Sequence, residues 1–344
     1  MVTGTGVRVS LFDGVLGVLT HCPHWPNGNG SVSAYEPYVR EIDVWSRLFK
    51  RVEVVAPRGE GSAGGNLAPY ELPTVRWRPV DYTMSVSRTG QLRRASQLPL
   101  LLYAMLRLIQ DTDLVLLRSP SHFSLFGRPL ARILGKPTLT KWAGLFDEFD
   151  GERLPSRIER AFVLRGPAPA LIYGPSTRAH LIPFFPALMS EAELSRARCL
   201  ARDREWKPPW RILSVGRLAK VKGFDLALRG LRRLRDVAPE IDWTYTLVGD
   251  GAFKSDLRAL VQELDLTDRV EFPGALRFAD AQERYGSAHV VIMPGTMEGW
   301  PKIIAEAWAH GAVPVAARAG IVPWIMNGCD TGAVFPPDPD GLAD

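Results

Sequence analysis

Residues 294–311 read PGTMEGWPKIIAEAWAHG, and this stretch decides how the rest of the sequence is interpreted. The apolar run HVVIM just before it is typical of a buried parallel strand. Proline suits the start of a helix and glycine its end, so we expect a helix from Pro301 to Gly311. Glu298 then lies in the loop at the carboxyl end of the strand, and Glu306 lies about two helical turns further along.

The E-x7-E spacing of Glu298 and Glu306 allows two interpretations. Glu298, beside the free N–H groups of a helix start, can accept hydrogen bonds from sugar hydroxyls. Glu306 can hold a ribose diol, while the helix N-terminus takes a phosphate. Alternatively, both are solvated charges that suit a helix. The spacing alone leaves both interpretations open.

The composition indicates a globular protein with room for two domains. The chain has 344 residues, of which 46% are hydrophobic and 23% charged. Its net charge of +5 suits an anionic substrate or an anionic membrane surface, and it is equally explained by the base composition of the genome. The sequence shows no nucleic-acid-binding signature, so we expect no nucleic-acid partner.

The cysteines and the apolar runs indicate the compartment. Cys22, Cys199 and Cys329 are few and far apart, which fits a reducing cytosol and predicts neither a disulfide framework nor a zinc site. The first residues lack the pattern of a signal peptide. The longest apolar run, Leu98–Ile109, is too short to span a bilayer. We therefore expect a cytoplasmic protein, with peripheral contact at the inner face of the membrane as an alternative.

The first half alternates short apolar runs with amphipathic stretches, which predicts a doubly wound parallel sheet. The expected strands are Val7–Leu11, Arg51–Ala56, Thr74–Arg78 ended by Pro79, Asp113–Leu117, Pro137–Thr140 and Pro169–Tyr173. A helix is expected over Gln97–Ile109, with Pro99 in its first turn. Arg93 and Arg94 before it suit either anionic lipid or a solvated lead-in to a core helix.

A long loop, His21–Gly30, is expected after the first strand. It includes Gly28 and Gly30, and Ser33 and Glu36 follow at capping-box spacing before a helix that reaches Phe49. A glycine turn that feeds a helix N-terminus suits a phosphate, although such turns also serve as plain connections.

The second half repeats the alternation. Its expected strands are Arg211–Val215, Trp243–Val248, Arg269–Phe272, 289–293 and Val313–Ala316, with helices over Phe224–Val237 and Leu257–Leu264. We therefore expect a first domain over 1–186, an interdomain segment over 187–208, where charges dominate, and a second domain over 209–344. The loops 216–223, 249–251 and 294–300 follow strands, where open parallel sheets bind their ligands.

Arg217 and Lys222 lie on one of these loops, between Gly216 and Gly223. A fixed pair of cations can neutralise a diphosphate as it leaves. Two solvated cations are the alternative. We favour the functional interpretation, because two carboxylates are predicted on a later loop of the same sheet edge.

Four segments of the second half occur in the order typical of one enzyme family. ILSVGRLAKVKGFD, LVGDG, RVEFPGAL and MEGWPKIIAEAWAHGAVPVA resemble the signatures of the retaining GT-B glycosyltransferases of family four. The resemblance covers the whole second half and, more loosely, the first. It implies two Rossmann-like domains whose parallel sheets face a central cleft. It also implies a donor sugar linked to UDP, GDP or ADP, a glycan or lipid-linked acceptor hydroxyl, and neither a metal nor another cofactor.

The resemblance also implies roles for individual residues. Arg217 and Lys222 match the diphosphate pair, Glu298 the sugar-contacting glutamate and Glu306 the ribose-binding glutamate. The remaining expected donor contacts are Gly216 on the first loop, Gly299, Trp300 and Pro301 on the third, and Gly28 and Gly30 in the first domain.

Three features depart from the family pattern. Many members carry a histidine where this chain has Lys141 and Trp142. His122 is a candidate for that role, with local packing or capping as the favoured alternative. Trp324 stands where a glutamate is common. The sequence stops at Asp344, before the family's last helices, so the resemblance implies a shortened end.

Three other functions remain as alternatives at this point. A nicotinamide dehydrogenase would need G-x-G-x-x-G after a first strand, and neither Val7–Leu11 nor Arg211–Val215 is followed by it. A non-catalytic sugar-nucleotide-binding remnant is compatible with the shortened end. Within the enzymes, a GT-B epimerase acting on a nucleotide sugar is the closest alternative.

Overall fold

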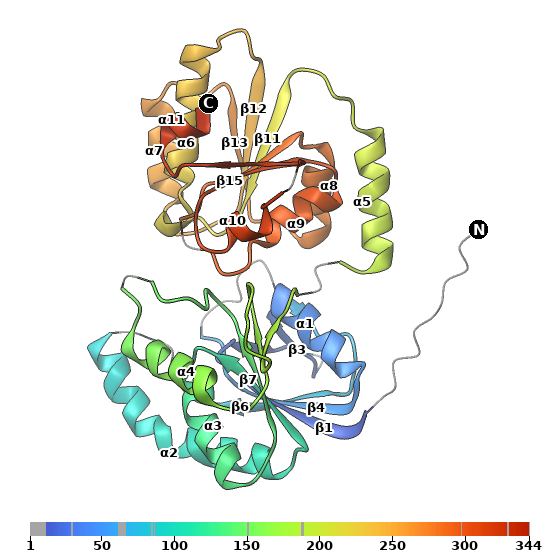
Figure 1. Ribbon diagram of the computed structural model, residues 1–344, viewed down its shortest axis with the longest axis vertical. Coiled ribbons are helices and arrows are strands. Elements are labelled where there is room, and N and C mark those ends of the chain that lie inside the picture. The colour runs from blue at the N-terminus through green and yellow to red at the C-terminus, as the bar shows by residue number, and fades with distance from the viewer. Residues whose placement is uncertain are drawn as a thin grey trace, which may run out of the picture. The chain divides into compact units, whose positions relative to one another are not determined.

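The computed structural model describes residues 12–343 except 29, 61–66, 84, 86, 150, 187–188, 297 and 329. The predicted strand Val7–Leu11 lies outside the described residues. The chain divides into two compact units, Met1–Pro186 and Ala187–Asp344, and each is built on a parallel sheet of its own (Figure 1). Residues 187–208, predicted as an interdomain segment, contain the helix α5 (Glu191–Asp203).

The first unit is built on a seven-stranded sheet of order β10-β9-β8-β7-β1-β4-β6, in which every neighbouring pair is parallel. Its strands are β1 (Phe12–Leu19), β4 (Phe49–Pro57), β6 (Val75–Val80), β7 (Leu114–Ser119), β8 (Thr138–Trp142), β9 (Ala170–Ile172) and β10 (Leu181–Pro183). Its helices are α1 (Glu36–Ser46), α2 (Arg88–Gln110), α3 (His122–Ile133) and α4 (Leu154–Arg165). A small antiparallel sheet joins β2 (His24–Pro26), β3 (Val32–Tyr35) and β5 (Leu67–Pro69).

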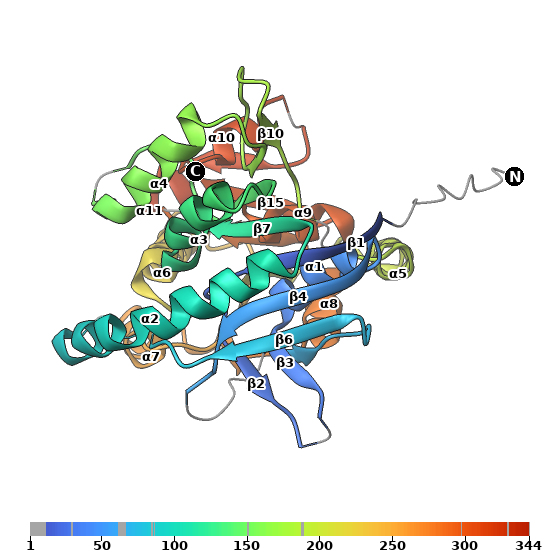
Figure 2. The same cartoon turned by 90° about the horizontal axis from the view of Figure 1, so that it is seen from below.

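Two hydrophobic cores cover the opposite faces of this sheet. Side chains alternate along a strand with a period of two, so neighbouring residues of β1 enter different cores. Leu19 packs with α2 and α3, whereas Leu16 and Val18 pack with α1. Figure 2 accordingly shows α2 and α3 side by side on one face and α1 on the other.

The second unit is built on a six-stranded parallel sheet of order β13-β12-β11-β14-β15-β16. Its strands are β11 (Trp210–Val215), β12 (Trp243–Val248), β13 (Val270–Gly274), β14 (Val290–Met293), β15 (Val313–Ala317) and β16 (Ala333–Phe335). With α5, its helices are η1 (Lys220–Lys222), α6 (Phe224–Val237), α7 (Lys254–Glu263), α8 (Phe278–Ser287), α9 (Lys302–Ala309), α10 (Val322–Ile325) and α11 (Pro339–Ala343). None of the helices in the described part of the chain is long and apolar enough to cross a membrane.

The predicted capping box before the first helix is wrong. Ser33 lies inside β3, where its hydroxyl accepts a hydrogen bond of 3.0 Å from Asn27 Nδ2. The helix α1 begins at Glu36, and its N-cap residue, Tyr35, makes no side-chain capping bond. The serine thus stabilises the β2–β3 hairpin instead of a helix start.

Two predictions based on proline are also wrong. Pro79 does not end the third strand but lies within β6. This strand is at the edge of the sheet, where a missing N–H is tolerated. The helix α2 begins at Arg88, well before Gln97, because Ser87 caps it by accepting a 3.1 Å bond from Gly90 N. Pro99 therefore lies inside the helix.

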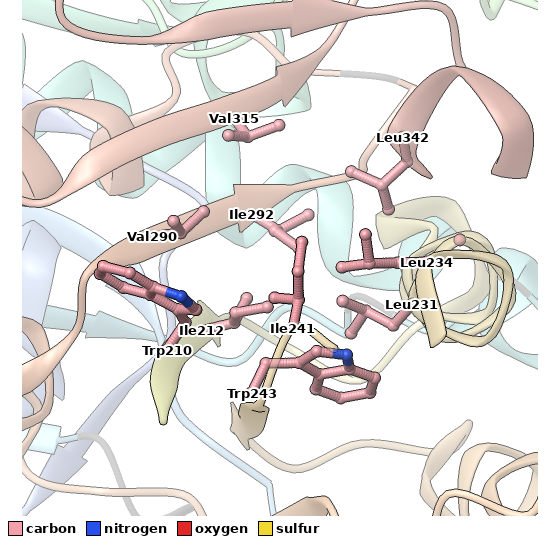
Figure 3. A pocket seen from close by; sticks show the side chains of 11 residues that line it. Trp210, Ile212, Leu231, Leu234, Ile241, Trp243, Val290, Ile292, Val315 and Leu342 are labelled. Carbon is pink, nitrogen blue, oxygen red and sulfur yellow. The ribbon is translucent and has the colours of Figure 1, made fainter. Parts of the chain in front are cut away.

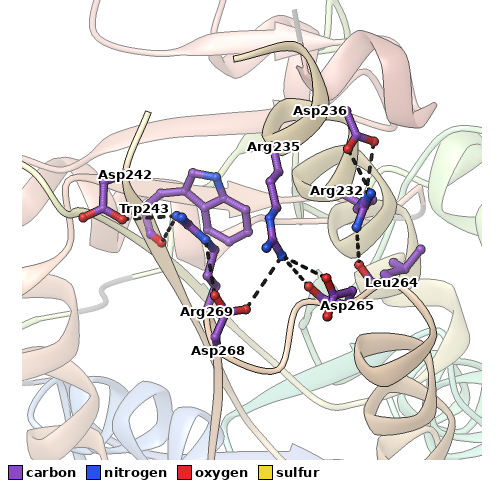
Figure 4. Close-up of polar contacts among 9 residues, drawn as sticks. All are labelled: Arg232, Arg235, Asp236, Asp242, Trp243, Leu264, Asp265, Asp268 and Arg269. Carbon is purple, nitrogen blue, oxygen red and sulfur yellow. Dashed lines mark hydrogen bonds and ion pairs between the residues drawn. The ribbon is translucent and has the colours of Figure 1, made fainter. Parts of the chain in front are cut away.

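Ion pairs on the outer surface join α6 to the segment between α7 and β13 (Figure 4). Arg235 contacts the carbonyl oxygen of Asp265 and lies 3.7 Å from Asp268 Oδ1. Arg232 donates a 3.0 Å bond to the carbonyl oxygen of Leu264. Exposed pairs of this kind contribute about 0–1 kcal/mol, so packing in the core stabilises the unit far more.

An apolar cavity of about 260 Å³ lies between the second sheet, α6 and α11 (Figure 3). Each described residue that lines it is apolar or glycine. Leu342 of α11 lies over Gly230 of α6, where an added Cβ would come within 2.6 Å of Leu342 Cδ2. The cavity therefore belongs to the helix packing, and it offers no group that would bind a nucleotide.

Replacing Leu342 with alanine is expected to lower the free energy of unfolding by about 1–2 kcal/mol, because apolar contact between α11 and α6 is lost. Urea denaturation would measure the change. The control is Val237→Ala, which removes an exposed apolar side chain from the end of α6 and should cost less than about 0.5 kcal/mol. Equal effects of the two substitutions would show that α11 contributes nothing to stability.

Candidate active site

The predicted ligand loops of the second unit all follow neighbouring strands of its sheet. Residues 216–223 follow β11, residues 249–251 follow β12 and residues 294–301 follow β14. Because β12, β11 and β14 are adjacent and parallel, the three loops lie at one edge of the sheet. Open α/β sheets bind their ligands at this edge, outside the carboxyl ends of the strands.

Two glycines bring the second of these loops against the first. Gly249 and Gly251 have φ of 148° and 159°, which side chains rarely adopt. A Cβ on Gly249 would lie 1.8 Å from the carbonyl oxygen of Gly216, and one on Gly251 would lie 2.3 Å from that of Leu218. The amide of Leu218 also donates a 2.9 Å bond to the carbonyl oxygen of Asp250. The backbone of the first loop is therefore fixed by close packing.

Glycines also position the loop that carries Glu298. Gly223, with φ of 65°, is so close to β14 that an added Cβ would lie 2.5 Å from the carbonyl oxygen of Pro294. Gly320 has a φ of 51°, and a Cβ added to it would lie only 2.4 Å from the carbonyl oxygen of Glu298. The segment around Glu298 is thus held between the loops that follow β11 and β15.

Lys222 and Glu298 form an ion pair between two of these loops. Lys222 Nζ contacts Glu298 Oε1 directly, and the two side chains are 28% and 12% exposed. The residues are 76 positions apart in the sequence. The structure therefore brings together two predicted site residues, one expected at the leaving diphosphate and the other at the sugar.

Arg217 lies on the same loop as Lys222, but its side chain is in a different environment. Its side chain is exposed, and no residue in the described part of the chain pairs with its guanidinium group. The preceding residue, Gly216, is half-buried. A Cβ added to Gly216 would lie 3.3 Å from Phe224 Cζ. Arg217 is thus a cation available to a ligand at the sheet edge, and it makes no contact with Lys222 or Glu298 here.

Glu306 is held apart from Glu298, in the second turn of α9. It lies beside the hydroxyl of Tyr285, on α8. Burial raises the pKa of Tyr285 well above its ordinary value, and the neighbouring carboxylate raises it further. The tyrosine therefore stays protonated beside Glu306, and its buried hydroxyl has no hydrogen-bond partner among the described residues. The sequence did not suggest this residue, because α8 was not predicted.

The remaining donor contacts expected on the third loop lie just before α9. Gly299 and Trp300 are half-buried, and Pro301 is buried at the N-cap position of the helix. The amide of Lys302 donates a 3.0 Å bond to the carbonyl oxygen of Trp300. This turn joins Glu298 to the helix that carries Glu306.

The structure corrects the setting of Gly28 and Gly30. They lie in the turn between β2 and β3, closed by a 2.8 Å bond from Asn27 N to the carbonyl oxygen of Ser31. The strand β3 separates this turn from α1, so the predicted glycine turn directly before a helix N-terminus is wrong. An added Cβ on either glycine would have no atom within 4 Å, so the turn has space around it.

The predicted strand Pro137–Thr140 stopped before Lys141 and Trp142, but both residues lie inside β8 and are buried. Lys141 Nζ contacts Glu41 Oε2, and Arg118 Nη1 lies 3.1 Å from the same oxygen. Although burial would raise the pKa of Glu41, the two cations hold it below its ordinary value. Lys141 therefore belongs to a buried ionic cluster.

His122 is the more accessible candidate for the family's first-domain histidine. It is half-buried at the first position of α3, and its Nδ1 lies 3.0 Å from the hydroxyl of Tyr82. Burial lowers its pKa, and the cations Arg94 and Arg153 lower it further. The imidazole is therefore neutral at pH 7 and lies in a positive environment.

No group of three or more His, Cys, Asp or Glu side chains that could hold a metal ion occurs within the described ranges. The arrangement at the second sheet edge offers instead an exposed arginine, a lysine paired to a carboxylate, and a second carboxylate on the following helix. Such a set can bind a polyhydroxylated, phosphorylated ligand.

Two units, each a parallel sheet with helices, are also found in solved glycosyltransferase structures with the GT-B fold. The structure is similar to that of HepE from Anabaena in complex with UDP and glucose, with a TM-score of 0.66 and 17% identity over 96% of this chain and 87% of that one. It is also similar to sucrose-phosphate synthase from Thermosynechococcus elongatus, with a TM-score of 0.65 and 16% identity over 96% and 88% of the two chains. The chain therefore has the GT-B fold.

Residues 209–344 match the sequence model of the family described as Glycosyl transferases group 1. This match agrees with the resemblance seen in the second half of the sequence, and it lies entirely within the second unit. A GDP-mannose-dependent alpha-mannosyltransferase of Mycolicibacterium smegmatis is 30% identical over 67% of this chain and 62% of its own length.

A putative colanic acid biosynthesis glycosyltransferase, WcaL of Escherichia coli, is 29% identical over 37% of this chain. The matched stretch spans only 32% of the length of WcaL.

Proposed function

We propose that this protein is a retaining glycosyltransferase that moves a sugar from a nucleotide-sugar donor to an acceptor hydroxyl. The observation that carries the proposal is the contact between Lys222 and Glu298. It joins a cation on the first glycine-bounded loop to a carboxylate on the loop that precedes α9. A sugar diphosphate needs a cation and a carboxylate close together, because its phosphates bind cations and its hydroxyls donate hydrogen bonds to acceptors.

The donor is proposed to lie at the carboxyl edge of the second sheet. Glu306, which lies beside Tyr285, would hold the ribose, and Glu298 would hold the sugar. The residues Gly216, Gly299, Trp300 and Pro301 would contribute backbone contacts. A nucleoside diphosphate is supported by the solved complexes of HepE with UDP and with UDP-glucose, and a GDP-linked sugar by the name of the mannosyltransferase. An ADP-linked sugar remains a third alternative.

In the proposed reaction the bond between the anomeric carbon and the phosphate oxygen breaks, and the acceptor hydroxyl attacks from the same face. The proton of the hydroxyl passes to the departing phosphate. Arg217 and Lys222 would stabilise the negative charge that develops on the diphosphate. These two side chains would take the part that a divalent cation has in other enzymes, so metal independence belongs to the proposal.

The acceptor is proposed to be a glycan or a lipid-linked precursor in polysaccharide biosynthesis. The names of two relatives support this class, namely the colanic acid transferase WcaL and the amylovoran transferase AmsK of Erwinia amylovora. Acceptor contacts are proposed in the first unit, from the segment 21–30 and from residues 98–109 of α2, while Gly28 and Gly30 remain proposed donor contacts.

A thermal-shift screen with UDP, GDP, ADP and their common sugars would identify the donor. Ligand at a hundredfold excess over its dissociation constant raises stability by about 2.7 kcal/mol. The donor that stabilises the protein is then incubated with glycan acceptors, and the anomeric configuration of the product is read by NMR. Retained configuration supports the proposal. Hydrolysis alone, epimerisation of the donor, or inversion would contradict it.

Replacing Glu306 with glutamine is expected to weaken donor binding by about 1–3 kcal/mol, because a hydrogen bond to a charged group is lost. Glu298→Gln should mainly reduce turnover, since its contacts strengthen as charge develops on the sugar. Calorimetry with the bare nucleoside diphosphate separates the two roles. Binding should fall in the Glu306 variant and not in the Glu298 variant, where Lys222 loses a competing carboxylate. The opposite pattern would reverse the two assignments.

A further inference from the structure

The helix α9, which carries Glu306, ends against a buried arginine. Arg204 follows α5 and is only 8% exposed. Its Nη1 donates hydrogen bonds of 2.6 Å to the carbonyl oxygen of Ala288 and 3.0 Å to that of His310, and its Nη2 contacts the carbonyl oxygen of Gly311. A guanidinium group is a rigid, planar fork of donors, so it holds several acceptors in fixed directions. Arg204 therefore anchors the backbone that follows α8 and the backbone that follows α9.

Two glycines let α5 approach these helix ends closely. Figure 1 shows α5 beside α8 and α9 in the second unit. A Cβ added to Gly286, in the last turn of α8, would lie 2.7 Å from Leu200 Cβ of α5. Gly311 has a φ of 61°, and a Cβ there would lie 3.2 Å from Ala201 Cβ. Close packing of α5 thus keeps Arg204 on the chain that follows α9.

His310 connects this anchored end to Glu306 itself. It is fully buried, and its Nδ1 lies 2.8 Å from the carbonyl oxygen of Glu306. Because a carbonyl oxygen only accepts hydrogen bonds, Nδ1 carries the ring proton. Burial lowers the pKa of His310 more than this bond raises it, so the imidazole is neutral at pH 7. The same carbonyl also accepts a 3.2 Å bond from the amide of His310.

The ring of His310 also supports the residue beside the carboxylate of Glu306. It stacks on Tyr285, with ring centroids 5.5 Å apart and an angle of 22° between the planes. Tyr285 is buried and lies next to the Glu306 side chain. Glu306 is therefore held at its backbone by His310 and flanked at its side chain by the ring on which His310 stacks.

We propose that Arg204 and His310 are positioning residues for Glu306, an inference that rests on the ribose role proposed above for this glutamate. A carboxylate that binds two hydroxyls of a ribose must lie within about 2.5–3.0 Å of both oxygens. A small shift of α9 would therefore weaken both hydrogen bonds. Arg204 opposes such a shift by anchoring the chain after the helix, and His310 opposes it by tying the last turn to Glu306.

Two substitutions of His310 separate positioning from packing. His310→Asn keeps a side-chain N–H near the place of Nδ1 but removes volume, whereas His310→Leu keeps the volume and removes the donor. Binding is measured by calorimetry with UDP, or with GDP or ADP where the thermal-shift screen selects it. It should be roughly 10-fold weaker in His310→Leu and near-parental in His310→Asn. The reverse order, equal losses, or no loss in either variant would overturn the proposal.

A double-mutant cycle with Glu306→Gln shows whether His310 acts through Glu306. In the Glu306→Gln background, His310→Leu should weaken nucleoside diphosphate binding by no more than about 2-fold, because the contact that it positions is already lost. A loss as large as in the parent would overturn this inference and leave the proposed function intact. If Glu306→Gln binds like the parent, the proposed ribose role is wrong, and this inference is overturned with it.

Arg204→Lys tests the second positioning residue. Lysine keeps the charge but lacks the planar fork, so nucleoside diphosphate binding should again weaken by roughly 10-fold. The matched control is Arg211→Gln. Arg211 donates a 2.6 Å bond to the carbonyl oxygen of Ser287, at the end of α8, and bonds to no residue of α9 among those that the structure describes. Its affinity should stay within about 2-fold of the parent, and equal losses in the two variants would overturn the role of Arg204.

Discussion

Replacing Lys222 with alanine is expected to lower sugar transfer by about 100-fold, as the loss of one preorganised charge contact often does. Lys222 ends the short helix η1, and its ammonium group is held against Glu298 at the ligand edge of the second sheet. A cation in a fixed position needs no reorganisation when the diphosphate leaves. Initial rates with a saturating donor would measure the loss, and circular dichroism would check that the variant is folded.

The variant Arg217→Ala isolates the same effect without disturbing a contact within the protein. The guanidinium group of Arg217 is exposed and has no partner among the residues that the structure describes. A comparable loss of transfer in this variant can therefore come only from a lost contact to the substrate. Lys220→Ala is the matched control, because Lys220 is an exposed lysine of the same loop. Its transfer rate should stay within a few-fold of the parent.

Two results would reject the assignment of the leaving-group pair. Near-normal rates in both Arg217→Ala and Lys222→Ala would show that neither cation meets the diphosphate. An equal loss in Lys220→Ala would show that the loop contributes only its overall positive charge. Loss in Lys222→Ala alone would leave Arg217 as a solvated cation, which was the alternative interpretation of the sequence.

Two elements of the second unit were predicted well because glycines in the local sequence mark where they begin or end. The helix over Phe224–Val237 and the strand over Trp243–Val248 were predicted with the bounds that the structure shows. Gly223 ends the loop before that helix, and Gly249 follows the strand, and each has a φ that favours glycine. Local sequence was enough here, because each end is fixed by a residue that tolerates few alternatives.

Contacts between distant residues account for what the sequence could not predict. The E-x7-E spacing suggested Glu306, but Tyr285 is on α8, a ten-residue helix that was not predicted, and the two residues lie 21 positions apart in the sequence. The hairpin around Gly28 depends on pairing between β2, β3 and β5, and strands this short give almost no local signal. Which side chains meet at a sheet edge is decided by tertiary structure.

Lys141 is another residue whose surroundings could not be predicted from the local sequence. A lysine argues against a buried strand, so the predicted strand ended before it. In the structure its side chain is almost fully buried in β8, against Glu41 of α1. The carboxylate that compensates its charge is one hundred positions away in the sequence. The residues next to Lys141 therefore give no sign that its charge is compensated. Lys141, one of the residues expected where many family members carry a histidine, is therefore almost fully shielded from solvent.

Replacing Glu41 with glutamine is expected to lower the free energy of unfolding by about 3–5 kcal/mol, because the buried Lys141 and the half-buried Arg118 then lose their counter-charge. Arg118 and Lys141 both contact the Oε2 atom of Glu41, so its carboxylate compensates them together. Lys141→Met should cost less than about 1.5 kcal/mol, because methionine has a similar volume and the pair of Glu41 with Arg118 remains. Urea denaturation would measure both changes.

The control on the same helix is Glu36→Gln, which breaks a half-buried pair with Arg40 one helical turn away and should cost less than about 1 kcal/mol. An effect of Lys141→Met as large as that of Glu41→Gln would show that the lysine and the glutamate form a closed pair and that Arg118 does not compensate the carboxylate. Activity adds a second readout. Since Lys141 is only 1% exposed, a folded Lys141→Met variant should transfer sugar at a near-parental rate. If transfer is lost while the fold is kept, Lys141 reaches the reacting groups after all, and the histidine's role has passed to it and not to His122.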